Sequence, residues 1–346
     1  MKAFKKVLAL ALAALFLVSV AGCSAGDVSY VVRTQDGAEV TPGMYVGYLM
    51  DAYMESLSLV EDTSSSPIGQ TIDGTDGGTW INNRALQNAK RYLAVSKKFD
   101  EMGLTFDAAA EETAKSLADN VWNTYGSLYE ENGCSYNSLL LVAEGTTKSN
   151  MIFEKLYGKD GEREIPESDI LAQFEEDYVE VRGLVATLTN NSGAALEGEE
   201  RQEYIDKLGE CAQRLQNGED FDTVSREYQK WYAEKKGYTF DESEYSSEEQ
   251  YTLLNKTGSS LSTSMVDDIF AANVGDVKLI SDASMAMVYV KNDVHRDPAQ
   301  LESVRLNVMH TLKNDEYLNL TDTWAEEMNL TVNENAFGYY TAQKIH

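Results

Sequence analysis

Asn217-Gly218-Glu219-Asp220-Phe221 is the stretch that decides the fold prediction. It lies between two segments with helical periodicity, 199–216 and 220–231. Gly218 can adopt the positive φ that ends a helix, and Asp220 can accept hydrogen bonds from the first N–H groups of the next one. Phe221 is large and apolar, so we expect it in a core. The stretch therefore predicts a tight turn between two packed helices.

A second turn, Phe270-Ala271-Ala272-Asn273-Val274-Gly275-Asp276-Val277, begins 49 residues after Phe221. It follows a short helical segment, 264–270, and precedes two strand-like runs, 277–280 and 285–290. A further strand-like run, 181–188, comes before the first turn. These elements predict a mixed α/β segment over 179–294.

The segments on both sides of this mixed part are helical. Thr41-Pro42 is typical of a helix start, and apolar residues then recur at four-residue spacing. We expect helices at 42–57, 81–99, 107–133, 139–142, 150–157, 167–178 and 298–328, strands at 28–32 and 330–332, and loops at 61–79, 189–198 and 236–258. The order predicts an α+β protein in which a compact unit is inserted between two helical halves.

The two turns resemble signatures of a known family. Gly218-Glu219-Asp220-Phe221 is similar to the Gly-x-Asp-Phe turn of parvulin-type peptidyl-prolyl isomerases, and the turn around Gly275 is similar to the turn that leads into the final hairpin of that family. Gly37-Ala38-Glu39-Val40-Thr41 resembles the entry into the first helix of PrsA-type foldases and SurA-type chaperones. Gly218, Asp220, Phe221 and Gly275 would then be structural signature residues.

The resemblance implies a domain organisation. PrsA-type and SurA-type proteins build a helical chaperone domain from both chain ends around an inserted parvulin-like domain with a four-stranded antiparallel sheet and helices. Here it implies a signal peptide at 1–22, a helical part at 23–178, a parvulin-like domain at 179–294 and a returning helical segment at 295–346.

The chain departs from the family at the catalytic positions. Isomerising members carry a His in the opening strand and another in the closing strand. Here the opening strand reads Val181-Arg182-Gly183-Leu184-Val185, and Ala286 or a neighbour takes the closing position. The three histidines, His295, His310 and His346, all follow the insert. We therefore expect no catalytic residue, and weak or no isomerase activity.

The resemblance also suggests a peptide-binding surface. Leu261, Met265 and Phe270 fall where the family lines its proline pocket, and all three are apolar. The alternative is ordinary core packing of a short helix, which the same spacing allows. Peptide contact for these residues is thus a hypothesis.

The N-terminus is typical of an exported lipoprotein. Lys2, Lys5 and Lys6 precede an apolar run, and Val20-Ala21-Gly22-Cys23 resembles a lipobox, whose Cys becomes the lipidated first residue. The alternative, a transmembrane anchor, needs about 20 apolar residues, more than this run offers. We expect lipidation at Cys23 and an extracytoplasmic location on the bacterial membrane.

Composition narrows the possible partners. The formal charge of −28 disfavours nucleic acid, whose phosphates such a surface repels. Beyond Cys23 the chain has only Cys134 and Cys211, which fit neither a zinc site nor a disulfide framework, although a single bridge stays possible. Adjacent acidic pairs such as Glu248-Glu249 lack metal-ligand spacing, so we expect no metal and no cofactor.

These features together predict a membrane-anchored foldase or chaperone that binds newly exported, unfolded polypeptides. One alternative is an active peptidyl-prolyl cis-trans isomerase. Another is an unrelated ligand-binding lipoprotein.

Overall fold

A computed structural model describes residues 27–190 and 192–345, which divide into two compact units. The chain up to Arg163 and from Asp315 onward forms the first, which we call the helical unit. Glu164–Asn314 forms the second, which we call the sheet unit and which runs past 179–294 at both ends. Helix α10 (Pro298–Glu327) contributes residues to both units.

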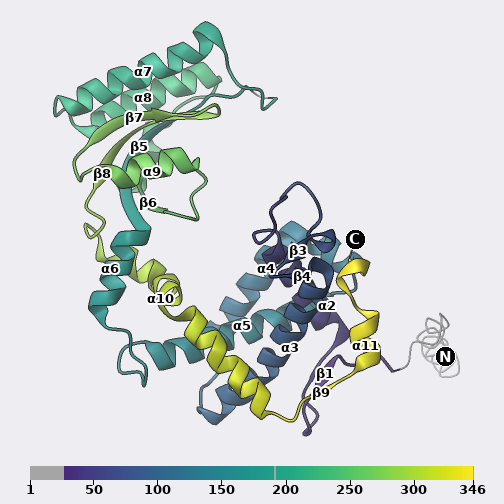
Figure 1. Cartoon of the computed structure of the whole chain (residues 1–346). Helices are drawn as coiled ribbons and strands as arrows, with labels where there is room; N and C mark the ends of the chain where they lie inside the picture. Colours follow the sequence, from purple (N-terminus) through teal and green to yellow (C-terminus); the bar gives the residue numbers. More distant parts are fainter. Residues whose placement is uncertain (1–26, 191, 346) are drawn as a thin grey trace, which may run out of the picture. The chain divides into compact units, whose positions relative to one another are not determined.

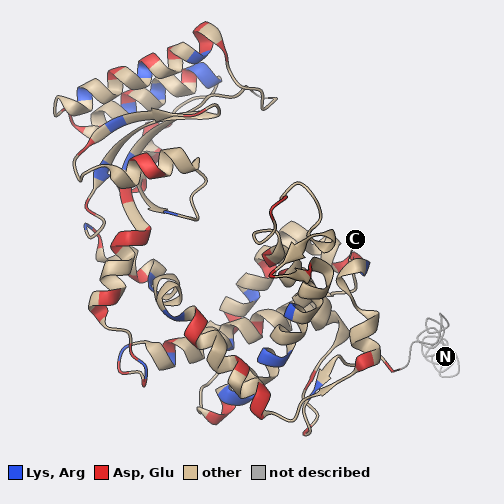
Figure 2. Cartoon of the chain, in the orientation of Figure 1, with Lys and Arg blue, Asp and Glu red and all other residues tan. Residues whose placement is uncertain are grey.

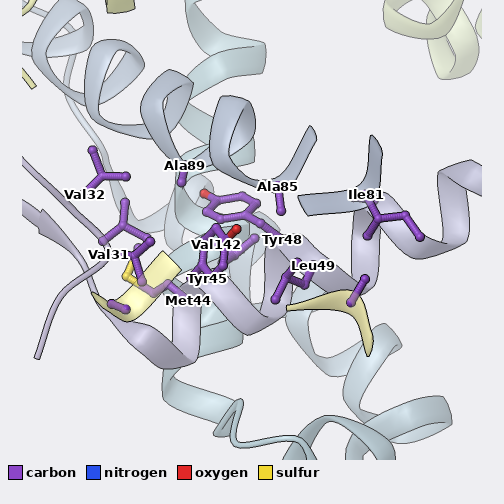
Figure 3. Close-up of a cluster of buried hydrophobic side chains, with 14 of the residues drawn as sticks. Val31, Val32, Met44, Tyr45, Tyr48, Leu49, Ile81, Ala85, Ala89 and Val142 are labelled. Atoms are coloured by element: carbon purple, nitrogen blue, oxygen red, sulfur yellow. The ribbon is translucent and has the colours of Figure 1, made fainter. Parts of the chain in front are cut away.

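The helical unit consists of long helices and very short strands. Its elements are β1 (Val32–Arg33), β2 (Glu39–Val40), α2 (Pro42–Ser56), η1 (Pro67–Gly69), β3 (Thr71–Ile72), β4 (Thr75–Asp76), α3 (Gly77–Glu101), α4 (Ala108–Glu131), α5 (Tyr136–Tyr157), the end of α10, β9 (Thr331–Val332), α11 (Glu334–Tyr339) and η4 (Ala342–Lys344). Figure 3 shows its main core, where α2 packs on α3. Tyr45 and Leu49 of α2 are fully buried against Ala85 and Ala89, whose small side chains let the two helices approach closely.

The first and the last described segments of the chain both contribute to the core of the helical unit. Strand β1 pairs with β2 on one side and with β9 on the other, with Val32 opposite Val332. Arg91 of α3 forms a bidentate ion pair with Asp322 of α10, with both N–O distances at 2.7 Å. The C-terminal segment is therefore a structural part of this unit.

The sheet unit contains the four-stranded antiparallel sheet that the resemblance implies. Its elements are α6 (Glu167–Asp177), β5 (Tyr178–Thr187), α7 (Gly198–Gln216), α8 (Phe221–Lys236), η2 (Glu242–Glu244), η3 (Glu248–Gln250), β6 (Tyr251–Asn255), α9 (Thr263–Ala271), β7 (Val277–Ser281), β8 (Met285–Asn292) and the start of α10. The strand order is β6-β5-β8-β7. Helices α7 and α8 cover one face of the sheet and α9 lies on the other (Figure 1).

The predicted helix starts are confirmed by their caps. The Thr41 hydroxyl accepts a hydrogen bond from the Met44 N–H at the start of α2. Asp107 accepts from the N–H groups of Ala109 and Ala110 at the start of α4. Such caps depend on residues within one turn, so a local sequence pattern is sufficient to locate them.

Four predicted elements are wrong in detail. The two helices expected at 139–142 and 150–157 are one continuous helix, α5, whose middle the apolar pattern marks weakly. The loop expected at 236–258 contains strand β6, which is fixed by pairing with β5 about 70 residues earlier. The loop expected at 61–79 contains the β3–β4 pair and the first residues of α3, and Ile72 is buried within it.

Within the described residues, each unit contains one buried cysteine. Cys134 lies in the helical unit and Cys211 in the sheet unit, and both are free thiols. Burial raises the pKa of the Cys134 thiol to about 12 and also raises that of Cys211. Acidic residues are spread over both units, with Lys and Arg interspersed (Figure 2).

Removing a core side chain from α2 will destabilise the helical unit. Leu49 is 1% exposed, so Leu49→Ala leaves a cavity, and we expect a loss of about 3 kcal/mol in the free energy of unfolding. Denaturant unfolding of the full chain measures this loss. The matched control is Met54→Ala on the same helix, where Met54 is 55% exposed and the change should stay below about 0.5 kcal/mol. Equal losses for the two variants would contradict the assigned core.

Candidate functional site

The sheet of the second unit separates two apolar clusters. Side chains alternate along a strand, so Leu184 and Ala186 of β5 pack towards α7 and α8, while Val179 and Val181 pack towards α9. By the same alternation, Gly183 and Val185 belong to the side of α9. We call this surface the α9 face, and its cluster comprises Val179, Val181, Leu254, Leu261, Met265, Ile269, Phe270, Ala272, Ile280, Met285, Met287 and Tyr289.

The three candidate peptide-binding residues come together in this cluster. Met265 of α9 is only 1% exposed, which makes it part of the core of the face. Leu261 and Phe270 are half-buried and retain accessible surface. The structure therefore brings the three side chains into one apolar region, in which Leu261 and Phe270 present surface to solvent.

Methionine occupies the place beside Gly183. A Cβ atom built on Gly183 would overlap the Cε of Met287 on the neighbouring strand β8. Ala286 is fully buried in the cluster on the opposite face, under α7. Of the residues considered for the closing-strand position, its neighbours Met285 and Met287 are thus the ones on the α9 face. At this point β5 presents a glycine, which has no side chain, and β8 presents the thioether of Met287.

The rim of the α9 face is apolar and accessible. Val185 is 40% exposed, and Ile280 and Met285 are half-buried. Methionine side chains are flexible and polarisable, so they can fit apolar groups of different shapes. Chemically, this surface can make van der Waals contacts and exclude water.

The polar groups beneath the face are used to attach α9. The Tyr289 hydroxyl donates to the Asp268 carbonyl (3.2 Å), and burial raises the pKa of Tyr289 to about 12. The Lys291 ammonium donates to the carbonyls of Phe270 (2.9 Å) and Ala272 (2.8 Å), and burial lowers its pKa. These contacts satisfy carbonyls at the C-terminal end of α9 and position its apolar side chains.

The signature residues have the local geometry expected for two turns. Gly218 has φ +83° and Gly275 has φ +89°, conformations that glycine adopts without strain. Asp220 caps α8 by accepting from the Thr223 N–H (2.9 Å), and Phe221 is buried in the cluster under α7 and α8.

Sequence reasoning missed a polar network at the start of β5. Glu180 has no exposed surface and accepts from the Arg296 Nε (2.7 Å) and Nη2 (3.1 Å), with a further hydrogen bond from Gln300. Arg296 also stacks on the Tyr251 ring, at 3.5 Å from its centroid. A buried carboxylate needs such partners. They lie about 116 residues away in the chain, so no local signal reveals them.

In the described part of the chain, the two histidines lie outside the apolar cluster of the α9 face. His295 contacts Glu175 of α6 (2.8 Å), and His310 lies in α10, where burial lowers its pKa. Within 27–190 and 192–345, no group of three or more His, Cys, Asp or Glu side chains could hold a metal ion.

The predicted signal peptide and the lipidation site Cys23 lie outside the described residues. Among the helices of the described part, none is long and apolar enough to cross a membrane.

The chain is similar to solved structures of PrsA foldases. The foldase PrsA from Lactococcus lactis matches at 14% identity over 92% of this chain and 99% of that one, with a TM-score of 0.40. PrsA from Streptococcus pneumoniae matches at 15% identity over 76% and 92%, with a TM-score of 0.41. PrsA from Bacillus subtilis matches at 13% identity over 87% and 93%, with a TM-score of 0.34. No family model and no curated protein matches. At these TM-scores the matches by themselves carry no conclusion about activity.

The β7–β8 turn, which leads into Met285, will lose stability in acid. Asp282 accepts from the N–H groups of Ser284 (2.8 Å) and Met285 (3.0 Å) and from the Ser284 hydroxyl, and these bonds lower the pKa of Asp282 to about 2. Because the folded-state pKa lies below the ordinary value of 3.8, the carboxylate stabilises the fold above about pH 4 and stops doing so as the pH falls towards 2. Asp282→Asn should therefore be less stable than the parent chain at pH 7, with a difference that shrinks between pH 4 and pH 2.

Urea unfolding at several pH values measures this difference, and a ¹³C NMR titration of the Asp282 carboxyl measures its pKa. The exposed Asp267 on α9 provides the control substitution Asp267→Asn. A titration midpoint for Asp282 close to 4 would contradict the assigned hydrogen bonds.

Proposed function

We propose that this chain is an extracytoplasmic foldase or chaperone that binds unfolded, newly exported polypeptides and has weak or no peptidyl-prolyl isomerase activity. The observation that carries the proposal is the α9 face. There the buried Met287 fills the space beside Gly183, and Leu261, Phe270 and Met285 of the same apolar cluster remain accessible. The motifs around Gly218, Gly275 and Gly37 support the same assignment.

Binding at the α9 face would be apolar and tolerant of sequence. Burying apolar surface contributes about 25 cal/mol per Å² removed from water, whatever side chain supplies it. The flexible thioether of the half-buried Met285 can adjust to branched or aromatic residues of a client. Unfolded clients expose such residues, so weak and reversible binding is the expected mode.

Isomerisation requires more than apolar contact. Rotation about a prolyl peptide bond has a barrier of about 20 kcal/mol, and an enzyme must stabilise the twisted amide to lower it. At Gly183 and Met287 the α9 face offers a backbone and a thioether, neither of which replaces a pair of imidazoles. The α9 face would therefore bind proline-containing segments but accelerate their cis–trans isomerisation only slightly.

Membrane anchoring completes the proposal. A lipidated Cys23 would hold the protein where exported chains emerge, and stable anchoring requires more than one acyl chain. Attachment raises the local concentration of the binding surface near its clients, which compensates for weak affinity. The net charge of −28 is compatible with polypeptide clients and disfavours nucleic acid as a partner.

A charge on the α9 face will weaken client binding. Val185→Asp in a chain spanning 24–346 should reduce affinity for a reduced, unfolded client about fivefold, because about 1 kcal/mol of apolar contact is lost. Fluorescence anisotropy with a labelled client measures the affinity, and circular dichroism checks the fold. The matched control is Val274→Asp, since Val274 is 63% exposed but lies in the turn between α9 and β7.

Failure of the parent chain to bind unfolded client or to slow its aggregation would refute the chaperone assignment. Strong acceleration of cis–trans exchange in a proline peptide would instead favour the isomerase alternative.

Cys23→Ala will release the protein from the membrane. Without the thiol no lipid can be attached, so the protein should move from the detergent phase to the aqueous phase after Triton X-114 partition of bacterial cells. Mass spectrometry of the parent chain should show the acylated N-terminus. Ser24→Ala is the adjacent control, and persistent membrane retention of Cys23→Ala would contradict the anchor.

A further inference from the structure

The helical unit contains an elongated depression that is separate from the α9 face. One hollow of about 540 Å³ lies between the β1–β2 turn, the last turns of α3 and the segment that follows α10. A second hollow of about 500 Å³ lies further towards the start of α3, lined there by Asn83, Leu86 and Lys90. Met328 and Leu330 line both hollows. We call the two together the α3 groove.

The dimensions of the α3 groove suit an extended chain. Its lining follows α3 from Asn83 to Glu101, which at 1.5 Å per residue is a length of roughly 27 Å. A polypeptide in extended conformation covers that length with about eight residues. The groove is therefore long enough for a peptide segment and larger than a single side chain requires.

The floor of the α3 groove is apolar and firmly supported. Leu93 is buried in the main core of the helical unit, and Met328 and Leu330 pack against the same core while remaining half-exposed. Leu86 is half-exposed in the second hollow and packs on the same core. Apolar side chains of an occupant would contact Met328 and Leu330 in either hollow, since both hollows share these two residues.

The rim of the first hollow is acidic. Asp36, Asp100, Glu101 and Glu327 line it, against the single cation Lys97. Lys97 pairs with Glu101 at 2.7 Å. Among the described residues, Asp36, Asp100 and Glu327 form no ion pair within 4 Å, so three carboxylates remain for an occupant. Glu327 is the last residue of α10.

Charge complementarity identifies the kind of occupant. Carboxylates around an apolar floor attract a segment that carries both Lys or Arg and apolar side chains, and they repel acidic segments. A second copy of this chain is disfavoured because two surfaces with a net charge of −28 repel each other.

We propose that the α3 groove binds an extended segment of unfolded polypeptide in which Lys or Arg residues flank Leu, Phe or Met. This inference rests on the proposed chaperone function and adds a second binding surface with a stated client chemistry. Apolar side chains lie on Leu93, Met328 and Leu330, and the cationic groups lie against Asp100, Glu327 and Asp36. Basic–apolar segments are then held by the helical unit in addition to any contact at the α9 face.

The test uses the chain spanning 24–346 and three fluorescein-labelled nine-residue peptides, in which Lys alternates with Leu, Glu with Leu, or Lys with Ser. Fluorescence anisotropy should show the Lys/Leu peptide binding at least tenfold more tightly than either of the others. Asp100→Asn combined with Glu327→Gln should weaken the Lys/Leu peptide about tenfold and reduce the salt dependence of its binding. The control is Glu130→Gln with Glu131→Gln on the exposed end of α4, which changes the net charge equally.

A steric variant tests the same groove without removing charge. Ala38 is exposed at the edge of the first hollow, so Ala38→Trp should obstruct it and weaken the Lys/Leu peptide without disturbing the core. Equal binding of the Glu/Leu peptide, or unchanged affinity in both groove variants, would overturn the inference. The groove variants could bind the Lys/Leu peptide normally while the parent chain still binds an unfolded client. In that case the α3 groove is not the binding site, and the proposed chaperone function stands. If no unfolded client binds to the parent chain, both the α3-groove inference and the proposed chaperone function are wrong.

Discussion

Closure of the helical unit by the C-terminal segment is the constraint on which the rest of the structure depends. Strand β1 is only two residues long, and it is stabilised from both sides by β2 and β9. The bidentate contact between Arg91 and Asp322 ties α3 to the end of α10 at a site where Arg91 is largely buried. Because these contacts are made by residues more than 200 positions apart, neither chain end can complete the core alone. The sheet unit, in contrast, is formed from one continuous stretch of sequence.

Local patterns were sufficient for much of the fold. Thr41, Asp107 and Asp220 mark helix starts because a cap involves only the next few residues, and Gly218 marks a helix end for the same reason. Strand β6 was missed because its conformation is fixed by pairing with β5, which lies about 70 residues earlier in the chain. The burial of Glu180 was likewise invisible, since its partner Arg296 belongs to a distant part of the chain.

The candidate site was predictable in outline only. Spacing from Phe270 selected Leu261 and Met265, and the structure has all three in one cluster. Sequence spacing could not decide whether Ala286 or a neighbour takes the closing-strand position. A one-residue difference in strand register exchanges the two faces of the sheet. The pairing of β5 with β8 resolves this, with Gly183 opposite Tyr289 and Val185 opposite Met287. The acidic rim of the α3 groove had no sequence signal, because its carboxylates come from three separate segments.

The two buried cysteines give each unit its own chemical marker. A thiol reacts as its thiolate, and burial both covers these sulfur atoms and raises their pKa values. Modification by an alkylating reagent therefore requires the surrounding unit to open. Cys134 reacts when the helical unit opens and Cys211 when the sheet unit opens. The native sequence thus allows the opening rates of the two units to be followed separately in one molecule, without any introduced label.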